Sequence, residues 1–567
     1  MKISLRTLAV FSLLFFTSIT AISAQRTATF FQKTYKPTQG VVPDTSSMSF
    51  QSVAKTADGG YGVFANYENR RNLGDIAFLR MDSLGNVKWS IDLRSDTTEN
   101  ATGMRVTPDG GFILCGWNAS PTDFSKGEML LTKITATGNI AWGTQFGGED
   151  VDEAGDVAVL NNGNIMVVGR SPQVVGGSYN GYFLLTSATG VPDNGQYLTF
   201  GNAPASLNSV DKTADGGAIA SGYGGSLFQP TSFDPIMVKF NSLGNVVWGK
   251  RYATAGTQFN NAVKQTRDLG YITMGQQAVT VNGNISQTFY VIKTNANGDT
   301  TWCKAYDTGK FEFAKSIVEV GEGYIVSGYA TVGVQNIIIK GSMGQDSTIV
   351  VDLQNSFSMK IDLTGNVKWG KLYGDSTKTG RSYSSTLGYD NGVTVVGETF
   401  GYGNKFGAGF MYHIDQNGNI GAGVNCQIRP ISFTASTFRI KDSTNVLTIE
   451  GGDERTNNLR RDTLSTTTTA ICTGTGLNTT GIAAHLLPEN SVKIYPNPAQ
   501  NTLFIENTEG GNETTNIQIF DVTGGLIQSF ASQNDVYELN VSHFAQGIYM
   551  VKIIKDGRYL VKKFIVD

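Results

Sequence analysis

The sequence predicts an all-β protein, a seven-bladed β-propeller followed by a small C-terminal β-sandwich. A Gly-x-x-x-Trp segment recurs along the chain, and its clearest copy, Asp362–Trp369, reads DLTGNVKW. The corresponding glycines are Gly85, Gly138, Gly190, Gly244, Gly298, Gly365 and Gly418, so the repeat is roughly 53 residues long. A fixed period of this length indicates a propeller or a solenoid.

A second turn precedes each Gly-x-x-x-Trp segment and divides the repeat into strands. It contains Asp-Gly, Asn-Gly or a related pair, as in Thr56–Tyr61, Thr107–Phe112 and Thr213–Ala218. These pairs favour hairpins because both central residues must tolerate φ > 0. The first repeat then has strands at Phe50–Thr56, Tyr61–Asn66, Ile76–Asp82 and Val87–Leu93. Seven such four-stranded repeats predict a seven-bladed propeller.

The fourth strands share a pattern of two aromatic residues four positions apart, as in Trp248–Tyr252, Trp302–Tyr306 and Trp369–Tyr373. Phe31–Tyr35 has the same pattern without three preceding strands, whereas the seventh repeat lacks it after Gly418. We therefore expect residues 30–36 to supply the last strand of the last blade. This would close the propeller, over residues 25–425, without an unpaired edge.

Composition and the N-terminal segment place the protein outside the cell. The chain has 567 residues, a net charge of -3, 68 glycines and only 16% charged residues, which is typical of a turn-rich secreted β protein and gives no electrostatic argument for nucleic acid. Lys2 and Arg6 precede the apolar run Leu8–Ile22, and small residues follow, so residues 1–24 are predicted to be a signal peptide. We expect no transmembrane segment elsewhere.

Residues 426–487 are expected to be a linker, because Thr, Ser, Gly and Asn dominate, with a hairpin packed within Ile428–Glu450. Cys115 and Cys303 lie in strand-like runs and are expected to be buried. Cys426 and Cys472 flank the linker and are the natural disulfide pair in an oxidising compartment, with free thiols as the alternative.

The last part, residues 488–567, alternates strictly and is expected to form a separate sandwich. It resembles the C-terminal type A sorting domain of the type IX secretion system of Bacteroidota. The resemblance implies passage through the outer membrane by the type IX machinery, followed by release or attachment at the cell surface. Its matching residues are Tyr495, Pro496, Asn497, Pro498, Gly524, Gly547, Tyr549, Lys562 and Lys563.

The Gly-x-x-x-Trp hairpin resembles the tryptophan-docking repeat of quinoprotein-type propellers. This resemblance covers the hairpin only, and it implies that the Trp residues lock neighbouring blades together. No motif singles out groups for a quinone, so no cofactor is predicted. The Asp-box spacing of sialidases is not met, since Gly85 lies three residues after Asp82 and Trp89 four after Gly85.

His413, His485 and His543 fall in three different regions, which leaves neither a histidine triad nor a zinc cluster within one domain. Carboxylate catalysis stays open, because it needs only two acids. The sequence therefore favours a binding or scaffold module for a glycan or a peptide rather than an enzyme. The alternative is a carbohydrate-active hydrolase or lyase on the same scaffold.

The connections after the second strands are long and varied, whereas those after the first and third strands are tight turns. We therefore expect ligand binding on the face with the long connections. Each candidate ligand residue lies at the end of a second strand. The alternative is that these side chains only pack against the loops. They are Asn66, Trp117, Arg170, Tyr223, Gln276, Tyr329 and Glu398.

Overall fold

The computed structural model describes residues 28–37, 47–68, 74–95, 97–120, 127–147, 150–172, 179–199, 204–225, 233–253, 256–281, 284–340, 346–402, 407–420, 428–432, 434–437, 441–444, 447–450, 454–456, 460–463, 466–476, 492–507, 515–521, 526–555 and 558–567. Throughout these ranges the regular elements are strands, and no helix there is long and apolar enough to cross a membrane. The predicted signal peptide, residues 1–24, lies outside them. The chain divides into two compact units, Met1–Gly476 and Leu477–Asp567.

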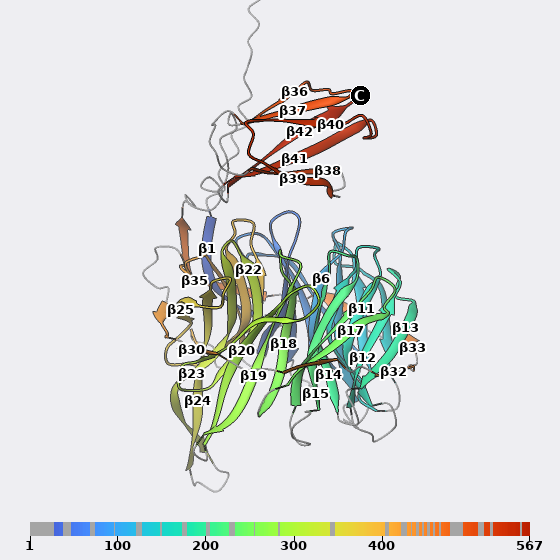
Figure 1. Cartoon of the computed structure of the whole chain (residues 1–567). Coiled ribbons are helices and arrows are strands. Elements are labelled where there is room, and N and C mark those ends of the chain that lie inside the picture. The colour runs from blue at the N-terminus through green and yellow to red at the C-terminus, as the bar shows by residue number, and fades with distance from the viewer. Residues whose placement is uncertain are drawn as a thin grey trace, which may run out of the picture. The chain divides into compact units, whose positions relative to one another are not determined.

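The first unit contains seven antiparallel sheets, numbered here 1 to 7 in chain order (Figure 1). Sheet 1 contains β2 (Ser47–Lys55), β3 (Tyr61–Glu68), β4 (Gly74–Met81) and β5 (Val87–Arg94). Sheet 2 contains β6 (Thr98–Val106), β7 (Phe112–Ala119), β8 (Met129–Ile134) and β9 (Ile140–Phe146). Sheet 3 contains β10 (Glu153–Val159), β11 (Ile165–Pro172), β12 (Tyr179–Thr186) and β13 (Pro192–Thr199). Sheet 4 contains β14 (Ala205–Lys212), β15 (Ala218–Gly225), β16 (Phe233–Phe240) and β17 (Val246–Ala253). Sheet 5 contains β18 (Thr257–Gln265), β19 (Tyr271–Val281), β20 (Asn284–Thr294) and β21 (Thr300–Asp307). Sheet 6 contains β22 (Glu312–Val320), β23 (Gly323–Lys340), β24 (Asp346–Ile361) and β25 (Val367–Tyr373).

Sheet 7 is built from two distant parts of the chain. It contains β26 (Gly380–Leu387), β27 (Val393–Thr399) and β28 (Ala408–Ile414), and its fourth strand is β1 (Ala28–Pro37). Phe31 of β1 pairs with His413, and Tyr35 pairs with Gly409. The segment expected to complete the last repeat therefore lies beside β28.

The first strands of successive sheets are in contact with one another, from β2 to β6 and onward to β26. The series returns to its start, because β26 also contacts β2. The buried core lies between the sheets. One cluster joins Phe31 and Tyr35 of β1 to Phe50 and Val63 of sheet 1.

The repeated Trp residues contact the following sheet. A Cβ added to Gly365 would lie 2.9 Å from the Trp302 ring, and Gly365 has φ +79°, so both the contact and the backbone require glycine. In the same fourth strand the hydroxyl of Tyr306 donates to the Gly365 carbonyl at 2.8 Å, and Lys304 Nζ lies 2.7 Å from Asn366 Oδ1. One Trp-x-Lys-x-Tyr strand thus fastens to the next sheet's turn in three ways.

β1 fastens sheet 7 to sheet 1 in the same manner, with Phe31 in place of Trp. A Cβ on Gly85 would lie 2.7 Å from the Phe31 ring. The hydroxyl of Tyr35 donates to the Gly85 carbonyl at 2.7 Å, and Lys33 Nζ lies 2.7 Å from Asn86 Oδ1. The junction made by the N-terminal strand therefore has the chemistry of a junction between consecutive repeats.

The segment expected to be a linker, residues 426–487, instead forms seven short strands where the structure describes it. Each pairs with the outer edge of a different sheet, so the expected hairpin within Ile428–Glu450 does not form. In chain order they lie on sheets 6, 5, 4, 3, 2, 1 and 7, opposite to the order of the repeats. They are β29 (Ile428–Pro430), β30 (Thr434–Thr437), β31 (Lys441–Thr444), β32 (Leu447–Glu450), β33 (Glu454–Thr456), β34 (Arg460–Thr463) and β35 (Thr466–Gly476).

We call β29 to β35 the belt. Its formation has a physical reason: every fourth strand has an outer edge of N–H and C=O groups, and an extended segment satisfies them. Thr occurs in linkers, but as a β-branched residue it is also enriched in strands. The composition that suggested a linker is therefore compatible with short edge strands once a partner edge exists.

Two of the connections expected as loops are strand extensions. β23 and β24 stay paired out to Lys340 and Asp346, which makes a hairpin that projects beyond the other sheets (Figure 1). β19 and β20 likewise continue to Val281 and Asn284.

The second unit consists of two sheets around one core. One sheet contains β36 (Val492–Tyr495), β37 (Thr502–Asn507) and β40 (Val536–Asn540), and the other contains β38 (Thr515–Asp521), β39 (Leu526–Ser532), β41 (Gly547–Lys555) and β42 (Arg558–Val566). Leu503 and Ile505 of one sheet and Val551 and Phe564 of the other are buried in the same cluster.

Candidate functional site

Every first strand contains a β-bulge at the same place. In each sheet, one residue of the first strand has no partner in the register with the second strand. A bulge leaves the extra residue unpaired and re-aims its side chain. The seven bulge residues are Gln51, Thr102, Gly155, Asn208, Asn261, Lys315 and Tyr383.

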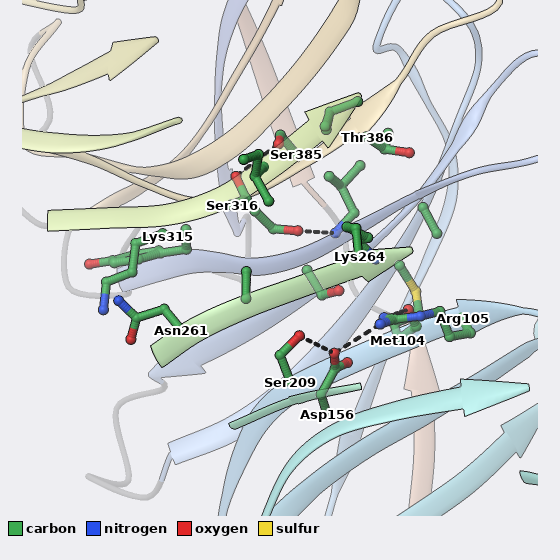
Figure 2. Close-up of a pocket in the computed structure, with 18 of the residues that line it drawn as sticks. Met104, Arg105, Asp156, Ser209, Asn261, Lys264, Lys315, Ser316, Ser385 and Thr386 are labelled. Carbon is green, nitrogen blue, oxygen red and sulfur yellow. Dashed lines mark hydrogen bonds and ion pairs between the residues drawn. The ribbon is translucent and has the colours of Figure 1, made fainter. Parts of the chain in front are cut away.

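All seven bulge residues line one cavity of about 700 Å³, which we call the seven-sheet cavity. Its walls come from β2, β6, β10, β14, β18, β22 and β26, the first strand of each sheet. Figure 2 shows part of it, with Asp156, Ser209 and Arg105 linked on one side and Lys315 and Asn261 together on the other. The volume is in the range usual for small-molecule sites.

Side chains around this cavity bridge neighbouring sheets. Arg105 donates to Asp156 at 2.8 Å, and Ser209 donates to the same carboxylate at 3.2 Å, which joins sheets 2, 3 and 4. The remaining junctions are made by Ala101 N to Asn66 Oδ1, Asn208 Nδ2 to Asn260 O, Asn261 Nδ2 to Ala314 O, Ser385 Oγ to Ser316 Oγ and Val53 N to Ser384 Oγ. Every junction between successive sheets, including that between sheets 7 and 1, therefore carries a hydrogen bond at this level.

The charged residues that line the cavity are mainly basic, although the chain as a whole carries a net charge of -3. The lining contains Lys55, Arg105, Lys212, Lys264 and Lys315 but only two carboxylates, Asp156 and Glu319.

Several of these charged groups already have a partner. Arg105 is paired with Asp156, and Lys264 with Asp211 at 3.1 Å. Lys55 lies over the Tyr389 ring, 4.2 Å from its centroid, and Glu319 accepts the backbone N–H of Arg267. Lys212 and Lys315 have no ion-pair partner among the residues that the structure describes.

The ligand residues predicted from the sequence occupy equivalent positions on seven different sheets. Each is half-buried and lies opposite the first-strand residue that is two positions before the bulge. The register pairs are Asn66 with Ser49, Trp117 with Asn100, Arg170 with Glu153, Tyr223 with Ser206, Gln276 with Phe259, Tyr329 with Phe313 and Glu398 with Arg381. They share one level of the fold, next to the bulge residues.

Two charged members of this set form ion pairs within their own sheets. Arg170 binds Glu153 through Nη2 at 2.7 Å and through Nε at 3.1 Å, in a bidentate arrangement. Glu398 accepts from Arg381 at 3.3 Å and from the hydroxyl of Tyr383 at 2.7 Å. The carboxylates at this level are therefore held by arginine rather than paired with each other.

Of the three aromatic members, Trp117 lies in sheet 2, Tyr223 in sheet 4 and Tyr329 in sheet 6. Tyr223 packs edge-on against Phe233 and Phe259, with ring centroids 5.1 and 4.9 Å apart. Tyr329 stacks on Phe313 at 4.8 Å, and the Arg381 guanidinium lies over its ring at 5.6 Å. These side chains have internal contacts, as the packing interpretation expects, and neither of them lines the cavity.

None of the seven ligand residues predicted from the sequence lines the seven-sheet cavity, and sequence reasoning did not single out the bulge residues. The available signal was an extra residue between two well-aligned halves of each first strand, as at Asn208 and Asn261. Because both faces of these strands are covered, their alternation is weak, and one inserted residue does not stand out.

Other residues singled out by the sequence have structural surroundings. His413 is stacked on Phe30, and its ring nitrogens bond Thr394 and Asp390, both at 2.8 Å. Cys115 and Cys303 are buried, and burial raises the pKa of Cys115 to about 12. Within the described ranges, no cluster of three or more His, Cys, Asp or Glu could hold a metal ion.

Cys426 and Gly524 lie outside the described residues, so the proposed pairing of Cys426 with Cys472, which lies in β35, stays a prediction.

The remaining sorting residues contribute to the fold of the second unit. Asn497 accepts from the backbone N–H of Ile565 at 2.9 Å and donates to the Lys563 carbonyl at 3.3 Å, which ties the Tyr495–Pro498 loop to the last strand. Tyr495 stacks on Phe504, and Tyr549, two residues after Gly547, donates to the Ala545 carbonyl. Lys562 and Lys563 lie in β42, opposite Val551 and Met550.

Residues 493–567 match the family model described as a secretion system C-terminal sorting domain. This match indicates export by type IX secretion, to the cell surface or the medium. No curated protein matches the chain. Among solved structures, the crystal structure of a tetra-tandem repeat in the extending region of a large adhesion protein matches with 13% identity, over 92% of this chain and 99% of that one. Its TM-score of 0.12 is too low to carry an argument about the fold or the function.

Proposed function

We propose that the seven sheets are the blades of a closed seven-bladed β-propeller that acts outside the cell as a binding or scaffold module. The observation that carries this proposal is the seven-sheet cavity, because the first strand of every sheet contributes a bulge residue to it. The contact of β26 with β2 and the fastening of β1 to Gly85 support closure. The Trp contacts with neighbouring turns support the likeness to tryptophan-docking propellers.

The ligand is proposed to be a glycan or a peptide, bound at the level of Trp117, Tyr223 and Tyr329, where aromatic side chains and bulge residues adjoin. The alternative of a carbohydrate-active hydrolase or lyase needs two acids placed for catalysis. Glu153 and Glu398 are each held by an arginine at this level, an arrangement that suits binding better.

A glycan-array screen of the secreted protein, followed by mass analysis of each bound glycan after incubation, tests this proposal. Binding without cleavage supports a binding module, and cleavage supports the alternative. Trp117→Ala and Tyr329→Ala should each weaken an identified ligand by at least about 1 kcal/mol. Substitutions at Ser83 and Leu84, two exposed residues of a tight turn, are the control and should leave affinity unchanged.

Export is proposed to begin with the signal peptide at residues 1–24, in a bacterium of the Bacteroidota. Deleting Ser491–Asp567 in a host that has a type IX secretion system should trap the protein in the periplasm. Delivery of the shortened chain at the normal level would contradict the assigned route.

A further inference from the structure

The bulge residues differ from sheet to sheet, and only one of them carries a charge. Lys315 is the bulge residue of sheet 6, whereas the others are amides, a hydroxyl, a glycine and a phenol. Lys315 lines the cavity, and the bulge leaves it outside the ladder between β22 and β23.

The neighbours of Lys315 supply no negative charge. Asn261 of sheet 5 donates its amide hydrogen to the Ala314 carbonyl at 2.9 Å, which places Asn261 next to Lys315 (Figure 2). On the other side, Arg381 is close enough to repel the ammonium. Burial and then this repulsion lower the pKa of Lys315. The ammonium is thus partly desolvated beside another cation.

A carboxylate on that side, Glu398, is already engaged. Glu398 binds Arg381 and also accepts the hydroxyl of Tyr383, and Arg381 donates in addition to Gln354 at 2.6 Å. Asp156, the acid on the opposite wall, is bonded by Arg105, Ser209 and the backbone N–H of Val210. Both acids are therefore already bonded, and Glu319, the other acid of the lining, accepts the backbone N–H of Arg267.

A partly desolvated cation without a counterion favours a negatively charged ligand, because an anion restores the lost electrostatic stabilisation. Hydrogen bonds in which one partner is charged are stronger than neutral ones, so hydrogen-bond donors beside Lys315 would stabilise a bound anion further. Asn261 and Tyr383, the bulge residues of the adjoining sheets, extend the polar surface on each side of Lys315.

We propose that the seven-sheet cavity binds a carboxylate group of its ligand, with Lys315 as the charged contact and Asn261 beside it. This inference rests on the proposed function, and it narrows the ligand class to acidic sugars or small carboxylic acids. The shared chemistry is the carboxylate. The carboxylate could belong to a sugar acid or to a small free acid, and the experiment distinguishes between these two ligands.

The test is isothermal titration of the full-length secreted protein with D-glucuronate, with acetate as the free carboxylate and with D-glucose as the neutral match. The expected result is that glucuronate binds and glucose does not. Lys315→Gln should weaken glucuronate at least about tenfold, the usual cost of losing one charged hydrogen bond. Lys88→Gln, which removes an exposed lysine outside the cavity lining, is the control and should bind like the wild type.

Proton uptake is a second readout. Because burial and the nearby Arg381 lower the pKa of Lys315, binding an anion should raise this pKa and take up protons, which titration in buffers of different ionisation enthalpy detects. Lys315→Arg keeps the charge and should keep most of the affinity, so an unfolded Lys315→Gln protein does not end the test.

Each outcome decides the proposal. Equal affinity for acetate and glucuronate supports it and assigns recognition to the carboxylate alone, and much tighter binding of glucuronate supports a sugar acid. Wild-type affinity in Lys315→Gln, or no binding of either anion, overturns it. If a neutral glycan from the array binds while both anions fail, the inference about Lys315 is wrong and the proposed binding function stands.

Discussion

The hydroxyl of Tyr35 gives a sharp test of whether β1 fastens the last sheet to the first in solution. Tyr35 is fully buried, and its hydroxyl donates to the Gly85 carbonyl at 2.7 Å. Burial, with smaller contributions from Asp82 and Tyr61, raises its pKa well above the usual value, so the donor stays protonated at any pH at which the protein is handled. Tyr35→Phe removes only the donor and leaves the carbonyl buried.

The expected cost follows from this geometry. A buried carbonyl that loses its partner destabilises the fold by about 1–3 kcal/mol, because it cannot turn to water instead. Three tyrosines at junctions between consecutive repeats make the same bond, each at 2.8 Å: Tyr252 to Gly298, Tyr306 to Gly365 and Tyr373 to Gly418. They are fully buried as well and serve as matched references.

The assay is equilibrium unfolding in guanidinium chloride, followed by Trp fluorescence, for the four single Tyr→Phe variants. We expect the four losses of unfolding free energy to agree within about 0.5 kcal/mol, with unchanged denaturant dependence. If Tyr35→Phe behaves like the wild type while the other three lose stability, β1 is not docked as described and the reasoning about the seventh junction is wrong.

Three further predictions follow from the buried acids, the belt and the second unit. Burial raises the pKa of Glu99 and of Glu312 from 4.5 to about 7. Between these pH values the folded protein therefore holds protons that the unfolded chain has lost. The free energy of unfolding should fall as pH rises through this range, by at most about 3 kcal/mol for each group. Glu99→Gln and Glu312→Gln should flatten the melting temperature between pH 5 and pH 8. Deleting residues 428–476 while keeping the second unit should expose the outer edges of all seven sheets and cause aggregation, detected by size-exclusion chromatography. Asn497→Ala should destabilise the second unit by about 1 kcal/mol and make it more sensitive to protease, because two bonds to the last strand are lost.

Each of these has a clear contrary result. A melting temperature that rises from pH 5 to pH 8, or glutamine variants that follow the wild type, would contradict the assignment of the two acids. A belt-deleted protein that stays monomeric with unchanged melting would mean that the outer edges need no cover. Equal protease resistance of Asn497→Ala and the wild type would remove Asn497 from the account of the second unit.

The repeats were predictable because their turns depend on local chemistry. Gly85 and Gly365 need positive φ, and the side chains that dock on them recur at fixed spacing, so the strand order and the place of Phe31–Tyr35 follow from short segments. The belt was not predictable in this way. Its strands have three or four residues in most cases, and their partner edges belong to repeats far away in the sequence.

The lining of the cavity was not predictable from the sequence, for a related reason. Trp117 and Tyr329 could be placed because they end strands that follow a recognisable turn. Lys315 could not, because its exposure to the cavity comes from one inserted residue in a strand that is covered on both faces. The charge balance of the cavity also depends on which acids are already bonded, and that is a property of side-chain contacts between sheets.

The strands that bound the first unit, β1 and β35, are direct neighbours, and Ala28 pairs with Gly476. The order of strands in this unit is therefore a cycle that the chain enters and leaves at one place. A linker of a few residues from 476 to 28 would make that cycle covalent, and new ends opened between β7 and β8 would leave every ladder intact. Such a circular permutant keeps the native contacts while moving the free ends to another sheet, so the position of the termini is separable from the architecture that they complete.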